Sequence, residues 1–294
     1  MKKMFMAVIA LMMTISASAQ FYIYYSDGTV AKVDSISMIA PEESEQPNPS
    51  AGIGVFSVSD SKQVTFSKGN LQYTQSTDTW SFAENQWDYL GEANIAIDAD
   101  VLADKVDLFG WSTGATNFGV STSNSNSSYG GDFVDWGANQ IGNDAPNTWR
   151  TLTNDEWLYM VFTRSNIENL RGVACVNGVN GLILLPDNWE CPAGLTFKSG
   201  FHGYGGKEFY ATYQTFTADQ WSKLETAGAI FLPAAGYRDG LGLLGVQIGG
   251  YYWSATEVEN TDAAGYYLEF SSRGGHMGYG LRYHARTVRL VKDL

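Results

Sequence analysis

The chain has 294 residues, of which 31 are acidic and 18 basic, so its formal net charge at neutral pH is −13. So acidic a protein repels nucleic-acid phosphates and anionic lipid headgroups, which argues against both kinds of partner. Aromatic residues make up 14% of the chain and glycine occurs 32 times, a combination typical of proteins rich in strands and loops.

The first 19 residues, MKKMFMAVIALMMTISASA, predict a secretory signal peptide. Lys2 and Lys3 precede an apolar run at 4–15, which is too short to span a bilayer. The Ala-Ser-Ala sequence at 17–19 predicts cleavage before Gln20, which would remove both lysines and leave a net charge of −15. We therefore expect an exported protein, in the periplasm, at the cell surface or secreted. No later apolar run is long enough for a transmembrane helix.

The rest of the chain divides into three parts by composition. Residues 20–39 predict a short β leader, a hairpin that turns at Ser26-Asp27-Gly28. Residues 40–52 contain three prolines among acidic and small polar residues, which is typical of a solvated linker. Residues 53–294 are numerous enough to form one domain that folds without a cofactor.

Two helices are predicted, each from a capping box. Thr153 precedes Glu156 by three residues in TNDEWLYMVFTRS, and Thr217 precedes Gln220 in the same way in TADQWSKLETAG, which Gly228 ends. The residues at helical spacing are Trp157, Met160, Val161 and Arg164 in the first segment and Trp221 and Leu224 in the second.

Most of the remainder predicts short strands, at 181–185, 229–233, 251–255, 266–271 and 287–291. Leu268 and Phe270 alternate with polar or amphipathic residues and are expected to face inward. Val288 and Leu290 are also expected inward, with Arg289 between them pointing to solvent. The glycine-rich GLGLLGVQIGG segment predicts a hairpin loop. Two helices among many short strands and long loops predict an α+β fold.

The two cysteines, Cys175 and Cys191, form a disulfide candidate. In an oxidising compartment such a bond would close 15 intervening residues and stabilise the fold by roughly 3 kcal/mol. The NGVNG turn between them favours the pairing, because it could lay the two segments side by side. The alternative is a pair of free thiols.

Several segments together resemble a known family. WRTLTNDEWLYM, GLILLPDNWECPAG, IFLPAAGYRDG, GGYYWSAT and RTVRLV occur in this order. They resemble the formylglycine-generating-enzyme-like branch of the C-type-lectin-like fold, in its major paralogous (FISUMP-type) form, over residues 52–294. The resemblance implies two main helices beside small antiparallel sheets, with long loops that carry function. The leader FYIYYSDGTV resembles the mature N-termini of exported proteins of Gram-negative bacteria.

The residues argue against an enzyme. The family's oxidases use a late pair of copper-binding cysteines, whereas no cysteine follows Cys191 here. His202 has no histidine partner four residues away, and His276 and His284 lack the third ligand that a zinc site needs. We therefore expect no catalytic residues and no metal-ligand set. Calcium is the one cofactor left open, because many C-type-lectin-like domains bind it. The oxygens considered for it belong to Asp98, Asp100, Asp104 and Asp107.

The C-terminal stretch RGGHMGYGLRYHAR, at 273–286, is the strongest candidate for binding. Between predicted core strands it combines tyrosine, histidine, arginine and glycine, residue types that dominate recognition loops. The candidate ligand-binding residues are Glu257, Glu259, Asn260, Asp262, Tyr266, Glu269, Ser271, Arg273, His276, Tyr279 and His284. The resemblance adds that several lectin-like proteins of this branch are diversified here by retroelements. Ordinary surface loops are the alternative.

The sequence therefore predicts an exported, non-enzymatic, adhesin-like or receptor-like protein whose C-terminal loop-and-strand face, which a retroelement could diversify, binds an extracellular protein or glycan. Two alternatives stay open. One is an altered sulfatase-modifying enzyme that lacks the copper cysteines. The other is a surface or pilus-associated subunit that uses residues 21–39 as an assembly strand.

Overall fold

The computed structural model describes residues 54–95, 104–112, 122–259, 261 and 263–294, together with the strands at 21–24 and 30–33. The chain divides into two units, Met1–Pro49 and Ser50–Leu294. In the first, β1 (Phe21–Tyr24) and β2 (Val30–Val33) pair antiparallel, as the sequence predicts. The predicted signal peptide at 1–19 lies outside the described residues, as do residues 40–52.

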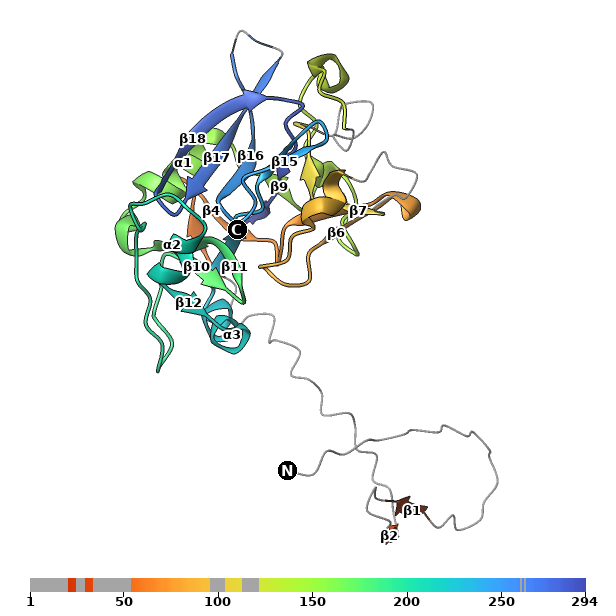
Figure 1. The fold of residues 1–294 in the computed structure, drawn as a ribbon, viewed down its shortest axis with the longest axis vertical. Coiled ribbons are helices and arrows are strands. Elements are labelled where there is room, and N and C mark those ends of the chain that lie inside the picture. Colours follow the sequence, from red (N-terminus) through yellow and green to blue (C-terminus); the bar gives the residue numbers. More distant parts are fainter. Residues whose placement is uncertain are drawn as a thin grey trace. The chain divides into compact units, whose positions relative to one another are not determined.

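The second unit is a mixed α+β structure of short helices and small sheets, as Figure 1 shows. Its α-helices within the described residues are α1 (Asn154–Leu158), α2 (Glu208–Tyr213) and α3 (Ala218–Thr226). A π-helical turn at Tyr159–Thr163 extends α1. Single 3₁₀ turns lie at Gln75–Thr77, Gly91–Ile95, Asn126–Tyr129, Trp136–Ala138 and Ile167–Asn169. Among the described residues no helix is long and apolar enough to cross a membrane.

The five-stranded sheet is the one that carries the C-terminal face. Its strand order is β18 (Gly274–Leu281), β17 (Ala264–Ser271), β16 (Gly249–Glu257), β19 (Arg286–Thr287) and β8 (Leu108–Phe109). β18, β17 and β16 pair antiparallel, and β19 pairs parallel to β16. β18 is therefore the outer strand of this sheet.

Four smaller sheets surround it. One four-stranded sheet has the order β12 (Thr215–Phe216), β10 (Arg171–Val176), β11 (Val179–Leu184), β13 (Ile230–Pro233). The other has the order β3 (Phe56–Ser57), β4 (Gln63–Phe66), β20 (Leu290–Asp293), β9 (Arg150–Thr151). The three-stranded sheet has the order β6 (Thr79–Phe82), β5 (Leu71–Thr74), β7 (Lys105–Val106). The two-stranded sheet is the hairpin of β14 (Tyr237–Asp239) and β15 (Gly242–Leu244), confirming the predicted glycine-rich hairpin.

Both predicted helices begin at the predicted capping boxes. The Thr153 hydroxyl accepts a hydrogen bond from the Glu156 backbone N–H, and the Glu156 carboxylate accepts one from the Thr153 N–H. Thr217 and Gln220 repeat this arrangement at α3, after which Gly228 adopts φ +93°. The residues at helical spacing are buried in both segments. α2 was not predicted, because its first turn lacks a side-chain cap.

The interior comprises three hydrophobic clusters, each built around tryptophan. Trp157 lies in the first, with Tyr252, Leu268 and Phe270 from the five-stranded sheet. The second holds four more tryptophans, including Trp253. The third joins α3 to β13. Large flat side chains of this kind bury much apolar area per residue, which lets short strands form a stable interior.

The predicted strand at 287–291 is wrong as a single element. The chain leaves β19 after Thr287 and joins a different sheet as β20 at Leu290. Arg289 therefore faces the interior rather than solvent and has 0% exposure. It donates from Nη2 to the Gln86 side-chain oxygen at 2.9 Å. Strand alternation does not predict the burial of Arg289, because the segment passes from one sheet to another and is buried along its length.

The predicted disulfide is also wrong, since both cysteines are free. The NGVNG turn does join two paired strands, but the residue opposite Cys175 is Asn180. β11 then runs away from Cys175 and ends at Leu184, so Cys191 follows beyond the far end of the hairpin. Cys175 is buried in the sheet and Cys191 is exposed.

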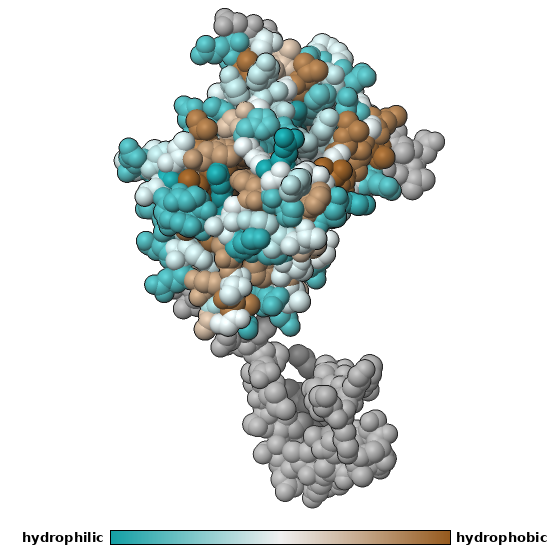
Figure 2. All heavy atoms as spheres, turned by 60° about the vertical axis from the view of Figure 1, so that its left-hand side comes forward, coloured by the Kyte–Doolittle hydropathy of each residue, from teal (hydrophilic) through white to brown (hydrophobic). Residues whose placement is uncertain are grey.

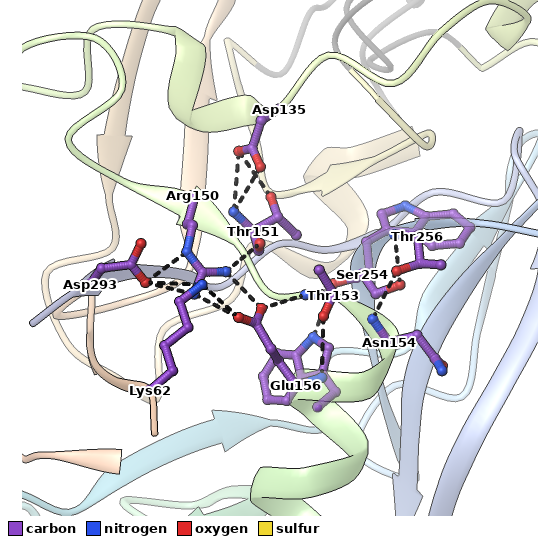
Figure 3. Close-up of polar contacts among 12 residues, drawn as sticks. Lys62, Asp135, Arg150, Thr151, Thr153, Asn154, Glu156, Ser254, Thr256 and Asp293 are labelled. Carbon is purple, nitrogen blue, oxygen red and sulfur yellow. Dashed lines mark hydrogen bonds and ion pairs between the residues drawn. The ribbon is translucent and has the colours of Figure 1, made fainter. Parts of the chain in front are cut away.

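An ion-pair network fastens the C-terminal strand to the start of α1 (Figure 3). Arg150 donates from Nη1 to Glu156 at 2.7 Å and from Nη2 to Asp293 at 2.7 Å. Lys62 lies 3.0 Å from the other oxygen of Glu156. Beside the network, the Asp135 carboxylate accepts a hydrogen bond from the Thr151 N–H at 2.9 Å. One set of ion pairs therefore links the start of α1 to β9, β20 and the residues before β4.

This network sets the protonation of its carboxylates. Burial acts to raise the pKa of Glu156, but hydrogen bonds from Arg150, Thr153 and Lys62 prevail and lower it. The hydrogen bond from Arg150 lowers the pKa of Asp293. A folded-state pKa below the unfolded value means that the network stabilises the fold above the ordinary carboxyl pKa. That stabilisation is lost as pH falls through the lowered values.

We expect Glu156→Gln to reduce the free energy of unfolding at pH 7 by about 1–3 kcal/mol, because Arg150 loses one of its two charged partners. Asp155→Asn, an exposed neighbour in the same turn that changes the net charge equally, should cost less than about 0.5 kcal/mol. The gap between the variants should narrow as pH falls through the lowered pKa of Glu156, because the carboxyl group of the unmodified protein then becomes protonated. Urea unfolding at pH 7 and over a series of lower pH values measures this, and equal losses at pH 7 would contradict it.

Candidate functional site

The candidate site lies on one face of the β16–β17–β18 part of the five-stranded sheet (Figure 1). The register places Tyr251, Glu269 and His276 side by side on three neighbouring strands. Trp253 and Tyr267 occupy the next row of the same face, because side chains two residues apart share a face. The opposite face buries Leu268 and Phe270 in the core and packs against α1.

A hollow of about 490 Å³ lies over this first face, next to the β14–β15 hairpin. It is lined mainly by aromatic residues around one arginine. The lining residues are Tyr237, Tyr251, Ala264, Tyr267, Glu269, Tyr279, Gly280, Leu281, His284 and Arg286. Its volume falls within the range of small-molecule sites, about 300–1,000 Å³.

Arg286 forms the base of this hollow and is 3% exposed. Its guanidinium lies 4.0 Å from the ring centre of Tyr267 and 4.3 Å from that of Trp253, so it contacts two aromatic rings, which stand at 83° to each other. Nη1 donates to the His284 carbonyl at 3.1 Å. Nε has no hydrogen-bond partner within the described part of the chain. Burial lowers the pKa of Arg286 to about 10, so it stays charged at neutral pH.

Two glycines of β18 make this arrangement fit. A Cβ at Gly280 would stand 2.5 Å from Nη2 of Arg286, and one at Gly278 would stand 2.9 Å from the Tyr267 ring. Both distances are well below van der Waals contact. The glycines of GGHMGYGL therefore serve packing, because they let an arginine and a tyrosine lie directly on the strand.

Tyrosine and histidine rings form a continuous wall. The rings of Tyr237 and Tyr251 are 4.9 Å apart at 69°, and those of Tyr237 and His284 are 5.5 Å apart. Tyr251 lies 6.1 Å from Tyr267. Burial raises the pKa of Tyr251 to about 12, which keeps its hydroxyl protonated. The wall thus offers flat apolar faces together with hydroxyls that can donate and accept.

The hollow contains one negative group opposite its arginine. Glu269 lines it, with its side chain 30% exposed and 3.7 Å from Nε2 of His276. Burial and the charge of Arg286 lower the pKa of His284, so its ring is uncharged at neutral pH, and its Nε2 lies 3.7 Å from Asp239. A charged donor, a charged acceptor and neutral hydroxyls therefore surround one aromatic hollow.

The structure brings together only part of the predicted set. Glu269, Tyr279 and His284 line the hollow, and His276 adjoins it through Glu269. Tyr279 borders the hollow only at its edge, because strand alternation directs its ring to the sheet's other face, where it lies 6.2 Å from the ring of Tyr266. Ser271 and Arg273 shape the β17–β18 turn, where the Arg273 N–H donates to the Ser271 hydroxyl. Glu259 is exposed beyond β16, and Asn260 and Asp262 lie outside the described residues.

The carboxylate of Glu257 is paired with a buried arginine and is not free to bind a ligand. It accepts a hydrogen bond from Nη2 of Arg282 at 3.1 Å. Arg282 is 1% exposed and lies 4.4 Å from the Trp111 ring. Because an unpaired buried guanidinium is destabilising, Glu257 contributes to stability here rather than to the hollow.

Residues 273–286, predicted as a surface segment between core strands, are in part structural. β18 pairs with β17 along its whole length, from Ala264 opposite Leu281 to Ser271 opposite Gly274. Arg282 and Arg286 are buried. Exposure is confined to a few side chains, with Tyr279 68% exposed and the His276 side chain 66% exposed. The stretch is both an outer strand and a support for the interior.

Tyr237, Tyr251, Tyr267 and Arg286 were not predicted as site residues from the sequence. Alternation within YYLEFSS does place Tyr267 on the face opposite to Leu268 and Phe270. Tyr237 lies in a hairpin 14 residues before Tyr251, so no local pattern joins them. Arg286 belongs to the candidate stretch, but a charged residue in a polar segment gives no signal of burial.

Of the four aspartates considered for calcium, the two that the structure describes have separate hydrogen-bond partners within the protein. Asp104 accepts from the Ser76 N–H at 2.9 Å. Asp107 is buried and accepts from the Leu90 N–H and the Asn94 amide, each at 2.8 Å. Asp98 and Asp100 lie outside the described residues. Within the ranges that the structure describes, no group of three or more His, Cys, Asp or Glu side chains could hold a metal ion.

A second hollow of about 590 Å³ lies between β4, β6 and the segment after α3. Its central polar group is already engaged, because Gln86 bonds to Arg289, Glu225 and the Phe231 N–H. The Nε atoms of Arg286 and Arg289 are both buried without a hydrogen-bond partner among the described residues, so they do not distinguish the two hollows. The first hollow differs in its lining of tyrosines around a charged arginine. In Figure 2 hydrophobic residues form several separate groups among hydrophilic ones, with no single broad apolar surface on that face.

Comparison with known proteins gave no match, whether with protein-family models, curated proteins or solved structures.

We expect Gly280→Ala to lower the free energy of unfolding by about 1–3 kcal/mol, because its methyl group would displace the buried Arg286 guanidinium. Gly274→Ala, on the same strand but with no atom within 4 Å of the added Cβ, should change it by less than about 0.5 kcal/mol. Chemical denaturation of both variants decides this. If Gly280→Ala leaves the free energy of unfolding unchanged, Arg286 is not held against the strand.

Proposed function

We propose that this chain is an exported, non-enzymatic binding protein that recognises an extracellular protein or glycan through the hollow around Arg286. The observation that carries the proposal is an open hollow of about 490 Å³ lined by tyrosines, with the charged Arg286 and the Glu269 carboxylate in its lining. Its volume and its combination of apolar faces with a few polar groups are typical of ligand sites.

The rest of the hollow supports binding. Rigid tyrosines offer contact area at low entropic cost, and they are among the residue types most enriched at recognition sites. Core packing on the opposite face of β16–β18 fixes their positions. Tyr279, 68% exposed on the outer strand, extends the contact surface beyond the hollow. Because β18 has no neighbour on its outer side within the described residues, a protein ligand could also approach along the strand.

The proposal extends to the fold family and location. We propose a C-type-lectin-like domain of the formylglycine-generating-enzyme-like branch, supported by the ordered motifs and by the observed α+β architecture. The signal-like residues 1–19 support export to the periplasm or cell surface. No cofactor is part of the proposal, and diversification of the C-terminal region by a retroelement stays a prediction.

We expect the full mature chain to bind at least one member of a printed glycan array or an array of extracellular proteins. Tyr237→Ala should weaken that binding about tenfold, since its ring forms part of the wall of the hollow. Tyr204→Ala is the control, because Tyr204 is 67% exposed and lies outside the hollow. Both variants should unfold cooperatively, with Tyr237→Ala melting up to about 5 °C lower because its half-buried ring packs on Tyr251.

Equal binding by Tyr237→Ala and Tyr204→Ala would place recognition elsewhere and contradict the proposed site. Absence of binding to either array would contradict the binding role itself. Repeating the positive interactions with EDTA tests calcium, which we expect to have no effect because side chains supply the contacts directly.

A further inference from the structure

We propose that β18 is the contact strand of a symmetric dimer, in which it pairs antiparallel with β18 of a second copy of this chain. β18 lies at the edge of the five-stranded sheet, as Figure 1 shows, and no described residue pairs with its outer side. None of its residues is buried. The pairing joins the five-stranded sheets of the two copies into one continuous sheet.

β18 lacks the features by which outer strands usually avoid such pairing. Proteins protect an exposed strand edge with proline, with charged side chains or with a bulge. The sequence GGHMGYGL contains no proline, lysine, arginine, aspartate or glutamate. Its register with β17 is unbroken from Gly274 to Leu281, so no bulge twists the edge away. The edge is therefore a template on which another strand can pair.

The register identifies the backbone groups of β18 that point outward. Bonded and non-bonded pairs alternate along an antiparallel ladder. The Arg282 N–H donates to the Ala263 carbonyl at 2.9 Å, so the alternate residues Gly280, Gly278 and His276 also bond to β17. The residues between them point their N–H and C=O groups away from β17. These outward residues are Gly275, Met277, Tyr279 and Leu281.

The available part of this edge is symmetric. The Leu281 carbonyl already accepts hydrogen bonds from the His284 N–H at 3.1 Å and from a buried guanidinium at 3.4 Å. The outward residues that remain are Gly275, Met277 and Tyr279. A two-fold axis at Met277 pairs this residue with itself and pairs Gly275 with Tyr279 of the second copy, so every outward group gains a partner. An edge that is symmetric about one residue is complementary to itself, which selects a second copy as the occupant.

The side chains fit this register. Tyr279, which is 68% exposed in the single chain, lies opposite Gly275 of the second copy. The Phe162 ring lies 3.4 Å from the position that a Cβ of Gly275 would occupy, so the tyrosine of one copy can contact the phenylalanine of the other. His276 lies opposite Gly278 in the same way. An aromatic ring that covers a glycine on the neighbouring strand stabilises the pair.

A strand from a different protein is the competing occupant. It could bond to the same backbone groups, but it need not place small residues opposite Tyr279 and His276, as β18 itself does. The net charge of −13 repels a second copy over long range, and β18 contributes no carboxylate to that repulsion. Pairing along one short strand buries a small area, so the dimer should be weak.

The symmetry also places the hollows of both copies on one side of the dimer. Paired residues of an antiparallel ladder point to the same face, so the face that carries Glu269 and His276 continues across the axis. A dimer would therefore bind a repeated ligand through two sites. This consequence rests on the proposed function, whereas the pairing of β18 does not.

The test follows the full mature chain by sedimentation, for which we expect a monomer–dimer equilibrium with a Kd of about 10–100 µM. Tyr279→Pro should weaken the dimer about tenfold or more, because proline removes an outward N–H and projects its ring toward the partner. As a monomer it should melt no more than about 5 °C lower, because that N–H makes no bond to β17. Tyr279→Val is the matched control, since it removes the ring but keeps the N–H, and it should weaken the dimer only about threefold.

Amide hydrogen exchange gives a second readout, which depends on the register. At a protein concentration of about ten times Kd, exchange at Gly275, Met277 and Tyr279 should slow about fivefold, since most chains are then paired. Exchange at His276 and Gly278, which already bond to β17, should change little. This measurement needs no variant, so it decides the outcome even where Tyr279→Pro folds poorly.

A chain that stays monomeric up to about 500 µM would overturn the proposal. A dimer that Tyr279→Pro and Tyr279→Val weaken equally, or one in which the outward amides gain no protection, forms through another surface and overturns it as well. Binding of array ligands by a monomeric chain would leave the proposed function intact, so the two proposals fail separately.

Discussion

Burial of charged arginine is the constraint on which this structure depends. Five of its eight arginines are buried. They are Arg164, Arg238, Arg282, Arg286 and Arg289. Arg164 shows the common solution, because it donates to Asp187 and to the Leu185 carbonyl at 2.7 Å each. A guanidinium has five donors in a rigid plane, so one buried arginine can fasten several irregular segments that make few sheet hydrogen bonds of their own.

The candidate site follows from the same constraint with one difference. Arg282 is neutralised by Glu257, and Arg289 is bonded to the Gln86 side chain in the interior. Arg286 instead relies on aromatic faces and backbone carbonyls, and it borders a hollow. Glycines on the outer strand permit this placement, and Tyr237 from a separate hairpin closes the far side. A buried arginine thereby borders a hollow that is open to solvent.

Burial of the arginines also changes the charge at the protein surface. The chain carries a net charge of −13, and much of its positive charge is not displayed on the surface. The surface is therefore predominantly negative and repels polyanions over long range.

The sequence alone determined the elements whose signals are local. Thr153 and Thr217 with their partners located two helices, and alternation located Leu268 and Phe270 on the core face, because caps and strand periodicity involve residues a few positions apart. Only the tertiary structure decided that residues 287–291 split between two sheets and that Arg286 is buried. Packing between distant segments sets both outcomes, and a sequence window that contains only one of those segments carries no record of the other.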